Sequence, residues 1–186
     1  MKKLSPLSAF FMGLCLAVSH SAFAQDRSQS RSMVASTGGI VASESVLASQ
    51  VGASILEQGG NAIDAAVATN AIMGLIAPMN DGIGGDLFVI VYEASTGELT
   101  GLNASGWAPA KLTPDHLRSK GISRMPTRGI DSVTVPGTVD GWDMLLTRFG
   151  NMNFRQVLAP SIAYAEEGFP VGEVVSIYWR DSVAAL

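Results

Sequence analysis

The amino-acid sequence predicts an α+β or layered α/β fold, on three observations. Residues 61–76 are apolar on nearly every side, and a helix of that kind is normally buried. Residues 87–92 are rich in β-branched and aromatic residues, and Ser95-Thr96-Gly97 turns the chain back into residues 98–102, which predicts a β-hairpin. Amphipathic helical patterns precede and follow these two features. Helices and strands in such mixed order are typical of layered folds.

The first helix is predicted upstream of the buried segment. Ser43 or Ser45 can cap its start, and Gly59-Gly60 ends it. Three apolar residues recur four apart between them, Leu47, Val51 and Ile55. This spacing is typical of an amphipathic helix.

The second helix, over residues 61–76, is predicted to belong to the core. At about sixteen residues it is shorter than the roughly 20 that cross a bilayer. It also contains Asp64, whose carboxylate we expect to accept hydrogen bonds from neighbouring amides rather than to act in catalysis.

The remaining elements follow the hairpin. Residues 133–135 predict a short strand, and Pro136-Gly137 a turn. A helix face then ends at Gly150, with four apolar residues, Val139, Trp142, Leu145 and Leu146. Another helix spans residues 153–168, with three residues predicted to point inward, Val157, Ile162 and Ala165. Residues 173–186 include five large apolar residues and end at Ala184-Ala185-Leu186 without a polar tail, so we expect only the N-terminal portion of a domain here, lacking its packing partner. The five are Val174, Val175, Ile177, Tyr178 and Trp179.

The N-terminus predicts export. Lys2 and Lys3 precede an apolar run, and Ala22-Phe23-Ala24 offers small residues for signal peptidase. We therefore expect a signal peptide over residues 1–24, a polar leader over 25–37, and a periplasmic or secreted protein. Cys15 lies inside the signal and follows Leu14, which does not fit a lipoprotein anchor. No membrane anchor is expected.

Charge and composition exclude several classes of function. The formal net charge is −4, so nothing attracts a polyanion and no nucleic-acid partner is expected. Removal of the signal leaves His116 as the only histidine and no cysteine. His116 follows Thr113-Pro114, which predicts a capped, solvent-facing helix start rather than a catalytic or zinc-binding histidine.

The glycine cluster Gly82-Ile83-Gly84-Gly85 alone suggests a dinucleotide-binding loop. That fingerprint requires a strand before it and a helix after it. Here the buried helix comes first and the strand follows. The sequence therefore favours a glycine turn that lets backbones pass closely, with lining of a substrate pocket as the alternative.

Five segments in this order resemble the γ-glutamyltransferase (glutathione hydrolase) family of N-terminal nucleophile hydrolases. They are Gly59-Gly60-Asn61-Ala62-Ile63-Asp64-Ala65-Ala66, Gly82-Ile83-Gly84-Gly85, Ala108-Pro109-Ala110-Lys111, Val135-Pro136-Gly137-Thr138-Val139-Asp140-Gly141, and residues 158–171. The resemblance implies a four-layer αββα sandwich, of which residues 38–186 are the N-terminal part of the large subunit. It implies a small γ-glutamyl or related acyl amide substrate, with no cofactor and no metal.

The resemblance also implies where the nucleophile lies. In the family a precursor cuts itself before a threonine, whose hydroxyl becomes the nucleophile and whose α-amine becomes the base. The threonine opens a Thr-Thr-His-like segment that this sequence lacks. We therefore expect no catalytic residue in this chain, inactivity of the chain alone, and partnership with the rest of the large subunit and the small subunit from the same precursor.

The resemblance places substrate contacts at Asn103, Ser105 and Trp107. Typical members have an arginine at the position of Ser105, where it holds the α-carboxylate of the γ-glutamyl group. A related subgroup has it at the position of Trp107. This departure leaves room for a larger or less charged acyl group, as in a glutaryl or cephalosporin acylase. A non-catalytic truncated periplasmic module is the alternative from another class.

Three questions about nearby side chains stay open at this stage. Trp107 either forms an aromatic wall of the pocket or fills core space beside Pro109. Asp86 is expected to cap a backbone amide rather than orient substrate. Three arginines in a predicted loop could replace the missing guanidinium, Arg118, Arg124 and Arg128.

Overall fold

A computed structural model describes residues 33–183. Residues 37–183 fall within one compact unit, and residues 33–36 are grouped with the N-terminal part of the chain. The predicted signal peptide and residues 25–32 of the predicted leader lie outside the described residues. In chain order the elements are α2 (Val46–Glu57), α3 (Ala62–Ile76), β1 (Leu87–Glu93), β2 (Glu98–Ala104), α4 (Pro114–Ser119), the 3₁₀ helix η1 (Ile130–Ser132), α5 (Thr138–Phe149), α6 (Phe154–Glu167) and α7 (Glu173–Val183). This mixture of helix and sheet confirms the α+β class.

The first two helices form as predicted. Ser45 stands at the N-cap of α2 without a side-chain capping bond, while the Ser43 hydroxyl donates to the Ser45 carbonyl oxygen. Gly59, with φ +92°, ends α2, and the Gly60 amide donates back to the Ile55 carbonyl oxygen at 2.9 Å. This glycine-terminated helix end satisfies carbonyls that the last turn would otherwise leave free.

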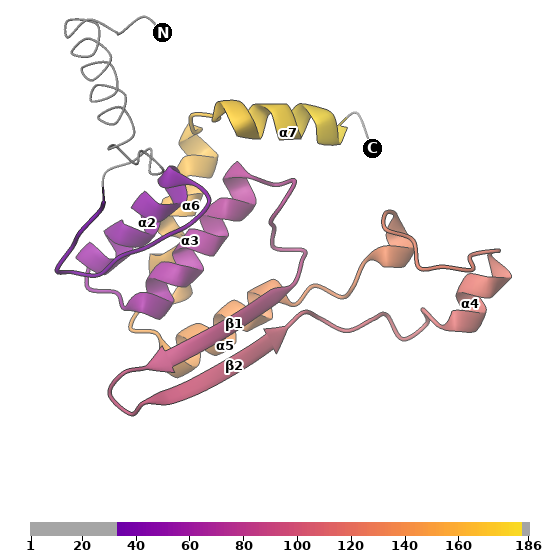
Figure 1. The fold of residues 1–186 in the computed structure, drawn as a ribbon, viewed down its shortest axis with the longest axis horizontal. Helices are drawn as coiled ribbons and strands as arrows, with labels where there is room; N and C mark the ends of the chain where they lie inside the picture. The colour runs from indigo at the N-terminus through magenta and orange to yellow at the C-terminus, as the bar shows by residue number, and fades with distance from the viewer. Residues whose placement is uncertain (1–32, 184–186) are drawn as a thin grey trace, which may run out of the picture. The chain divides into compact units, whose positions relative to one another are not determined.

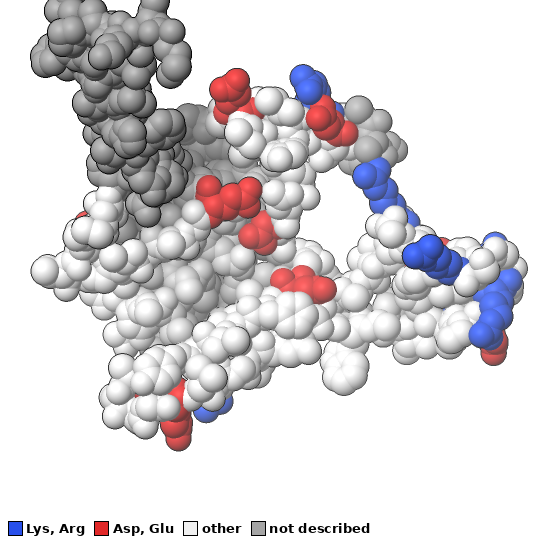
Figure 2. Space-filling model, in the orientation of Figure 1, with Lys and Arg blue, Asp and Glu red and all other residues white. Residues whose placement is uncertain are grey.

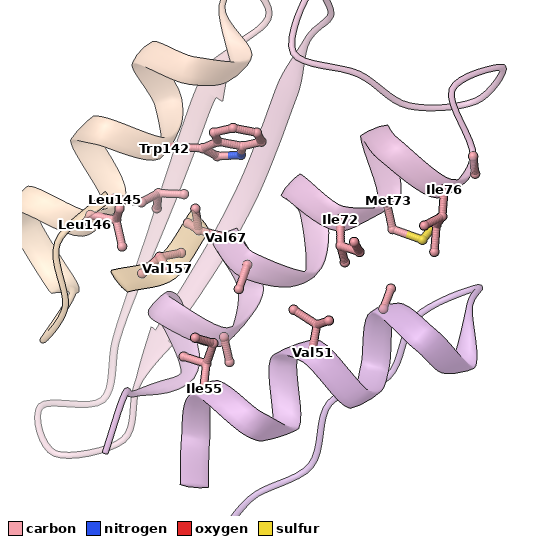
Figure 3. Packing of buried hydrophobic residues seen from close by; sticks show 14 residues of the cluster. Val51, Ile55, Val67, Ile72, Met73, Ile76, Trp142, Leu145, Leu146 and Val157 are labelled. Carbon is pink, nitrogen blue, oxygen red and sulfur yellow. The ribbon is translucent and has the colours of Figure 1, made fainter. Parts of the chain in front are cut away.

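The core lies where four helices meet. Figure 3 shows the labelled side chains of α2, α3, α5 and α6 pointing toward one another. Ile55 of α2, Ile72 of α3 and Val157 of α6 are completely buried, and Trp142 of α5 is almost so. Full burial of such side chains contributes about 1.5–3 kcal/mol each. These contacts hold α5, and with it one wall of the site described below, against α3.

The hairpin is antiparallel, with Leu87 opposite Ala104 and Glu93 opposite Glu98. Figure 1 shows α5 behind the two strands. Successive side chains alternate between faces, and the inward set packs on the core: Leu87, Val89, Val91, Leu102 and Ala104. The opposite face is apolar yet exposed, with Phe88, Ile90, Tyr92 and Leu99.

Two predictions about the second half of the chain were wrong in detail. Residues 133–135 form no strand, because Val135 makes one backbone bond to the 104–107 segment and Pro136 has no amide to extend a ladder. In α6 only Val157 is buried, whereas Ile162 and Ala165 are exposed. No residue of α7 is buried within the described part of the chain.

Candidate functional site

A cavity of about 470 Å³ lies between the end of β2 and the start of α5. One wall comes from residues 103–107, and the other from residues 135–137 with Asp140 and Met144 of α5. The three residues predicted as substrate contacts, Asn103, Ser105 and Trp107, therefore line one cavity. Asp140 and Met144 also line it and were not predicted from the sequence.

Two glycines allow the walls to meet. Gly106 has φ +75°, and a Cβ there would lie 1.7 Å from the Val135 carbonyl oxygen. A Cβ on Gly137 would lie 2.2 Å from the Ala104 carbonyl oxygen. Between them the Val135 amide donates to the Trp107 carbonyl oxygen at 2.9 Å. Residues 104–107 and 135–137 thus cross at a backbone separation that only glycine permits at Gly106 and Gly137. This backbone crossing forms the base of the cavity.

The Gly82–Gly85 cluster supports the same crossing. The amides of Gly137 and Thr138 both donate to the Gly85 carbonyl oxygen at 3.2 Å. A Cβ on Gly74 would lie 3.2 Å from the Cα of Gly82, so the loop passes close to α3. The prediction of a turn that lets backbones approach is confirmed.

A side-chain network fixes this glycine loop. Asp81 accepts hydrogen bonds from the Gly82 amide at 3.0 Å and from the Asn70 carboxamide at 3.1 Å. The Trp142 indole in turn donates to the Asn70 carboxamide oxygen at 2.8 Å. Asp86 accepts from the Thr134 hydroxyl at 3.1 Å, so the prediction that it caps a backbone amide was wrong. Its partner is a side chain 48 residues away.

Asn103 and Ser105 adopt a local turn. The Ser105 amide donates to the Asn103 carboxamide oxygen at 3.0 Å, which is the Asx-turn geometry. The Ser105 hydroxyl makes a long bond of 3.5 Å to the Gly106 carbonyl oxygen. The hydroxyl group is therefore weakly engaged by the protein and lines the cavity.

Trp107 does not fill core space. Its side chain is 85% exposed and lines the cavity. The interpretation that it packs in the interior beside Pro109 was wrong, because the 104–107 segment leaves the hairpin edge after Ala104, its last buried residue.

The three arginines considered from the sequence do not line this cavity. Arg118 lies on α4, where it pairs with Asp115 at 2.7 Å. Lys120 pairs with Asp131 at 2.8 Å. Figure 2 shows Lys and Arg gathered at the right, over α4 and its flanking segments. His116 also lies on α4, exposed, with its amide bonded to the Thr113 hydroxyl at 3.1 Å, as predicted.

Asp64 is buried completely and holds two distant segments together. Its carboxylate accepts from the amides of Asn61 at 2.8 Å, Asn151 at 3.1 Å and Met152 at 3.1 Å. The Asn61 carboxamide donates to the Phe149 carbonyl oxygen at 2.5 Å. The prediction that Asp64 satisfies amides is confirmed, and the motif around it joins α3 to the α5–α6 connection.

A comparison with family models matches residues 48–186 to the model described as gamma-glutamyltranspeptidase. The chain belongs to this family. Among curated gamma-glutamyltranspeptidase relatives, a glutathione hydrolase-like proenzyme of Bacillus subtilis (strain 168) is 44% identical over 139 residues, which are 74% of this chain and 26% of that protein. The chain thus spans about a quarter of the length of the curated relatives it matches.

Solved structures similar to this chain include a member of the same family. The Helicobacter pylori gamma-glutamyltranspeptidase gives a TM-score of 0.75 at 30% identity, covering 81% of this chain and 44% of that one. A cephalosporin acylase from Bacillus halodurans gives 0.74 at 38% identity, covering 84% of this chain and 30% of that one.

The family motifs stabilise the backbone around the site in this chain. The first forms the end of α2 and the cap of α3, and the second carries the carbonyl that Gly137 and Thr138 bind. The third position of α5, Asp140, lies within the fourth motif. Gly106 and Gly137 were the signal that could have predicted its approach to Ser105, since each stands where two backbones cross.

Within residues 33–183, no group of three or more His, Cys, Asp or Glu side chains could hold a metal ion. Across the same residues, every helix is too short or too polar to span a membrane.

Proposed function

We propose that this chain is the N-terminal part of the large subunit of an N-terminal nucleophile amidohydrolase, which cleaves γ-glutamyl or related acyl amide bonds. The cavity lined by Asn103, Ser105 and Trp107 supports this most directly. It lies in the segment where the family resemblance puts acyl-group contacts. Residues 1–24 serve as signal peptide, residues 25–37 as leader, and residues 38–186 as the first part of the catalytic domain.

The uncovered face of the hairpin supports a four-layer αββα sandwich in the whole protein. Exposed Phe88, Ile90, Tyr92 and Leu99 form an apolar sheet face, and such faces pack against another layer. A second sheet from downstream parts of the same precursor covers it. The partners of this chain are thus the rest of the large subunit and the small subunit.

In the proposed enzyme the nucleophile comes from the small subunit. A measurement of hydrolysis in the full-length protein therefore distinguishes this enzyme from a non-catalytic truncated module. Residues 25–186 expressed alone are expected to release no p-nitroaniline from γ-glutamyl-p-nitroanilide. The full-length precursor is expected to split in two and to release it. N-terminal sequencing of the smaller product should give threonine. A precursor that neither splits nor hydrolyses would support the non-catalytic module.

Ser105 is expected to make glutathione a poor substrate. An arginine paired bidentately with a carboxylate is worth a few kcal/mol, or about a hundredfold in affinity. Ser105→Arg in the full-length protein should therefore raise kcat/KM for glutathione relative to acyl amides without an α-carboxylate. A wild-type protein that already prefers glutathione, with no gain from Ser105→Arg, would show that another residue holds the carboxylate.

A glutaryl or cephalosporin acylase is the second candidate. The 38% identity to a protein titled cephalosporin acylase and the absence of arginine at position 105 favour it. Hydrolysis of a glutaryl amide in preference to a γ-glutamyl amide would decide for it.

The mature protein is periplasmic or secreted. We expect Edman sequencing of the exported product to begin near Gln25, because Ala22-Phe23-Ala24 fits signal peptidase. A mature protein that retains Met1 would contradict the proposed localisation.

A further inference from the structure

The side-chain amide of Asn70 links three parts of the fold: α3, on which it lies, α5, and the glycine loop Gly82–Gly85. Its carboxamide oxygen accepts from the Trp142 indole at 2.8 Å, and its NH₂ group donates at 3.1 Å to Asp81, directly before the loop. An indole can only donate and a carboxylate can only accept, so the position requires an acceptor and a donor on one short side chain. Figure 3 shows Trp142 pointing from α5 toward α3.

Two residues of α3 that face the glycine loop are poor helix formers. Asn70 and Gly74 lie one turn apart and so share a face of the helix. Both are less favourable than alanine in a helix interior. Asn70 binds the residue before the loop, and a Cβ on Gly74 would lie 3.2 Å from the Cα of Gly82. The formation of α3 does not explain these two residues, whereas their contact with the loop does.

The glycine loop in turn holds the start of α5. Asp81 accepts a hydrogen bond from the Gly82 amide at 3.0 Å. Three residues later, the Gly85 carbonyl oxygen accepts from the amides of Gly137 and Thr138, each at 3.2 Å. Gly137 lines the candidate cavity, and Thr138, the first residue of α5, is buried. The loop therefore fixes one wall of the cavity through its backbone.

These contacts form a closed ring of α3, the glycine loop and α5. The helix α5 begins at the residue that the loop binds, and its Trp142, one turn further on, returns to Asn70 on α3. Linked hydrogen bonds of this kind act as a unit. The crossing at Gly106 and Gly137 transmits the position of α5 to residues 103–107. Both walls of the cavity thus depend on the ring.

We propose that Asn70 is a positioning residue for the reaction, because it sets the place of the cavity walls through Asp81 and Trp142. Asn70 itself lies outside the cavity lining. The inference rests on the proposed function, since it takes the cavity to be part of the active site. A displacement of about 1 Å that starts far from the reacting atoms can cost about a hundredfold in rate. Loss of the ring should therefore weaken substrate use in a protein that still folds.

Exchange of two side chains tests the ring, because it preserves every hydrogen bond. Asn70→Asp places two carboxylates face to face, and Asp81→Asn leaves one pair of donors face to face whichever way the amides turn. In Asn70→Asp/Asp81→Asn, the carboxylate at position 70 accepts from Trp142 and from the amide at position 81. The oxygen of that amide still accepts from Gly82. We expect each single variant of the full-length protein to raise KM about tenfold, and the double variant to return to within about threefold of the wild type.

Ile55→Val is the matched control for a loss of stability alone. It shortens a completely buried side chain of α2 outside the ring, so it should lower the urea midpoint and leave KM unchanged. The substrate is whichever p-nitroanilide the wild type hydrolyses better, γ-glutamyl or glutaryl, at a temperature where circular dichroism shows every variant folded. A wild-type KM in Asn70→Asp, or a double variant no better than the single ones, would overturn the positioning role.

Amide hydrogen exchange decides the case in which the wild type hydrolyses neither donor. That result would remove the proposed function alone, because the ring can be measured without a substrate. Followed by mass spectrometry, residues 104–107 and 135–138 should exchange about tenfold faster in Asn70→Asp than in Ile55→Val. The double variant should exchange there like the wild type. Exchange in Asn70→Asp no faster than in Ile55→Val would overturn the positioning role, whether or not the protein is an active enzyme.

Discussion

Gly106→Ala is expected to lower the free energy of unfolding by about 2–5 kcal/mol, combining roughly 1–2 for a left-handed backbone with about 1–3 for overpacking. The φ of Gly106 is +75°, and the added Cβ would fall 1.7 Å from the Val135 carbonyl oxygen. The backbone would have to move, which breaks the bond from the Val135 amide to the Trp107 carbonyl oxygen. Urea unfolding of the purified protein, followed by circular dichroism, measures the change.

Gly101→Ala is the matched control. Gly101 lies on the exposed face of β2, and a Cβ there meets nothing within 4 Å. We expect this variant to unfold close to the wild type. Equal stability of the two variants would mean that the backbone crossing at Gly106 is not as tight as described.

Asp64→Asn is expected to destabilise the protein by about 3 kcal/mol, because a buried donor left without an acceptor costs about 1–3 kcal/mol and bonds to a charged group are the stronger ones. Both carboxylate oxygens accept backbone amides: Oδ2 takes that of Asn61, and Oδ1 that of Met152. The asparagine side chain replaces one oxygen with an NH₂ group, which would face an amide donor. The thermal midpoint and the urea midpoint should both fall.

Asp143→Asn is the matched control for Asp64→Asn, since it makes the same chemical change at an exposed position of α5. It should leave both midpoints within error of the wild type. If Asp64→Asn behaved like this control, the carboxylate would not be what joins α3 to the α5–α6 connection.

Local signals explain why much of the fold could be predicted. Asn61 caps α3 through bonds to the amides of Ile63 and Asp64, and Gly59 ends α2. Both depend on residues within four positions of each other, so the sequence pattern contains them. The hairpin was predicted for the same reason, since its turn directly joins the paired strands.

The site depended on contacts that no local pattern specifies. Whether Trp107 is buried or exposed depends on where the chain goes after Ala104, and that direction is set by the crossing with Val135. The strand expected over residues 133–135 required a neighbouring ladder that the structure does not provide there. Asp140 joined the candidate site only because α5 packs through Trp142 against α3.

The hydrogen bonds of Asp64 have a consequence for the order in which the chain folds. Asp64 and Asn151 are 87 residues apart in the sequence, so the amides that receive the carboxylate emerge from the ribosome long after α2 and α3. Until they arrive the carboxylate must stay hydrated, because an unpartnered buried charge is costly. The helical pair therefore cannot complete its packing early in synthesis. For a chain proposed to be exported, this delay keeps α2 and α3 incompletely folded while the chain passes through a translocation channel.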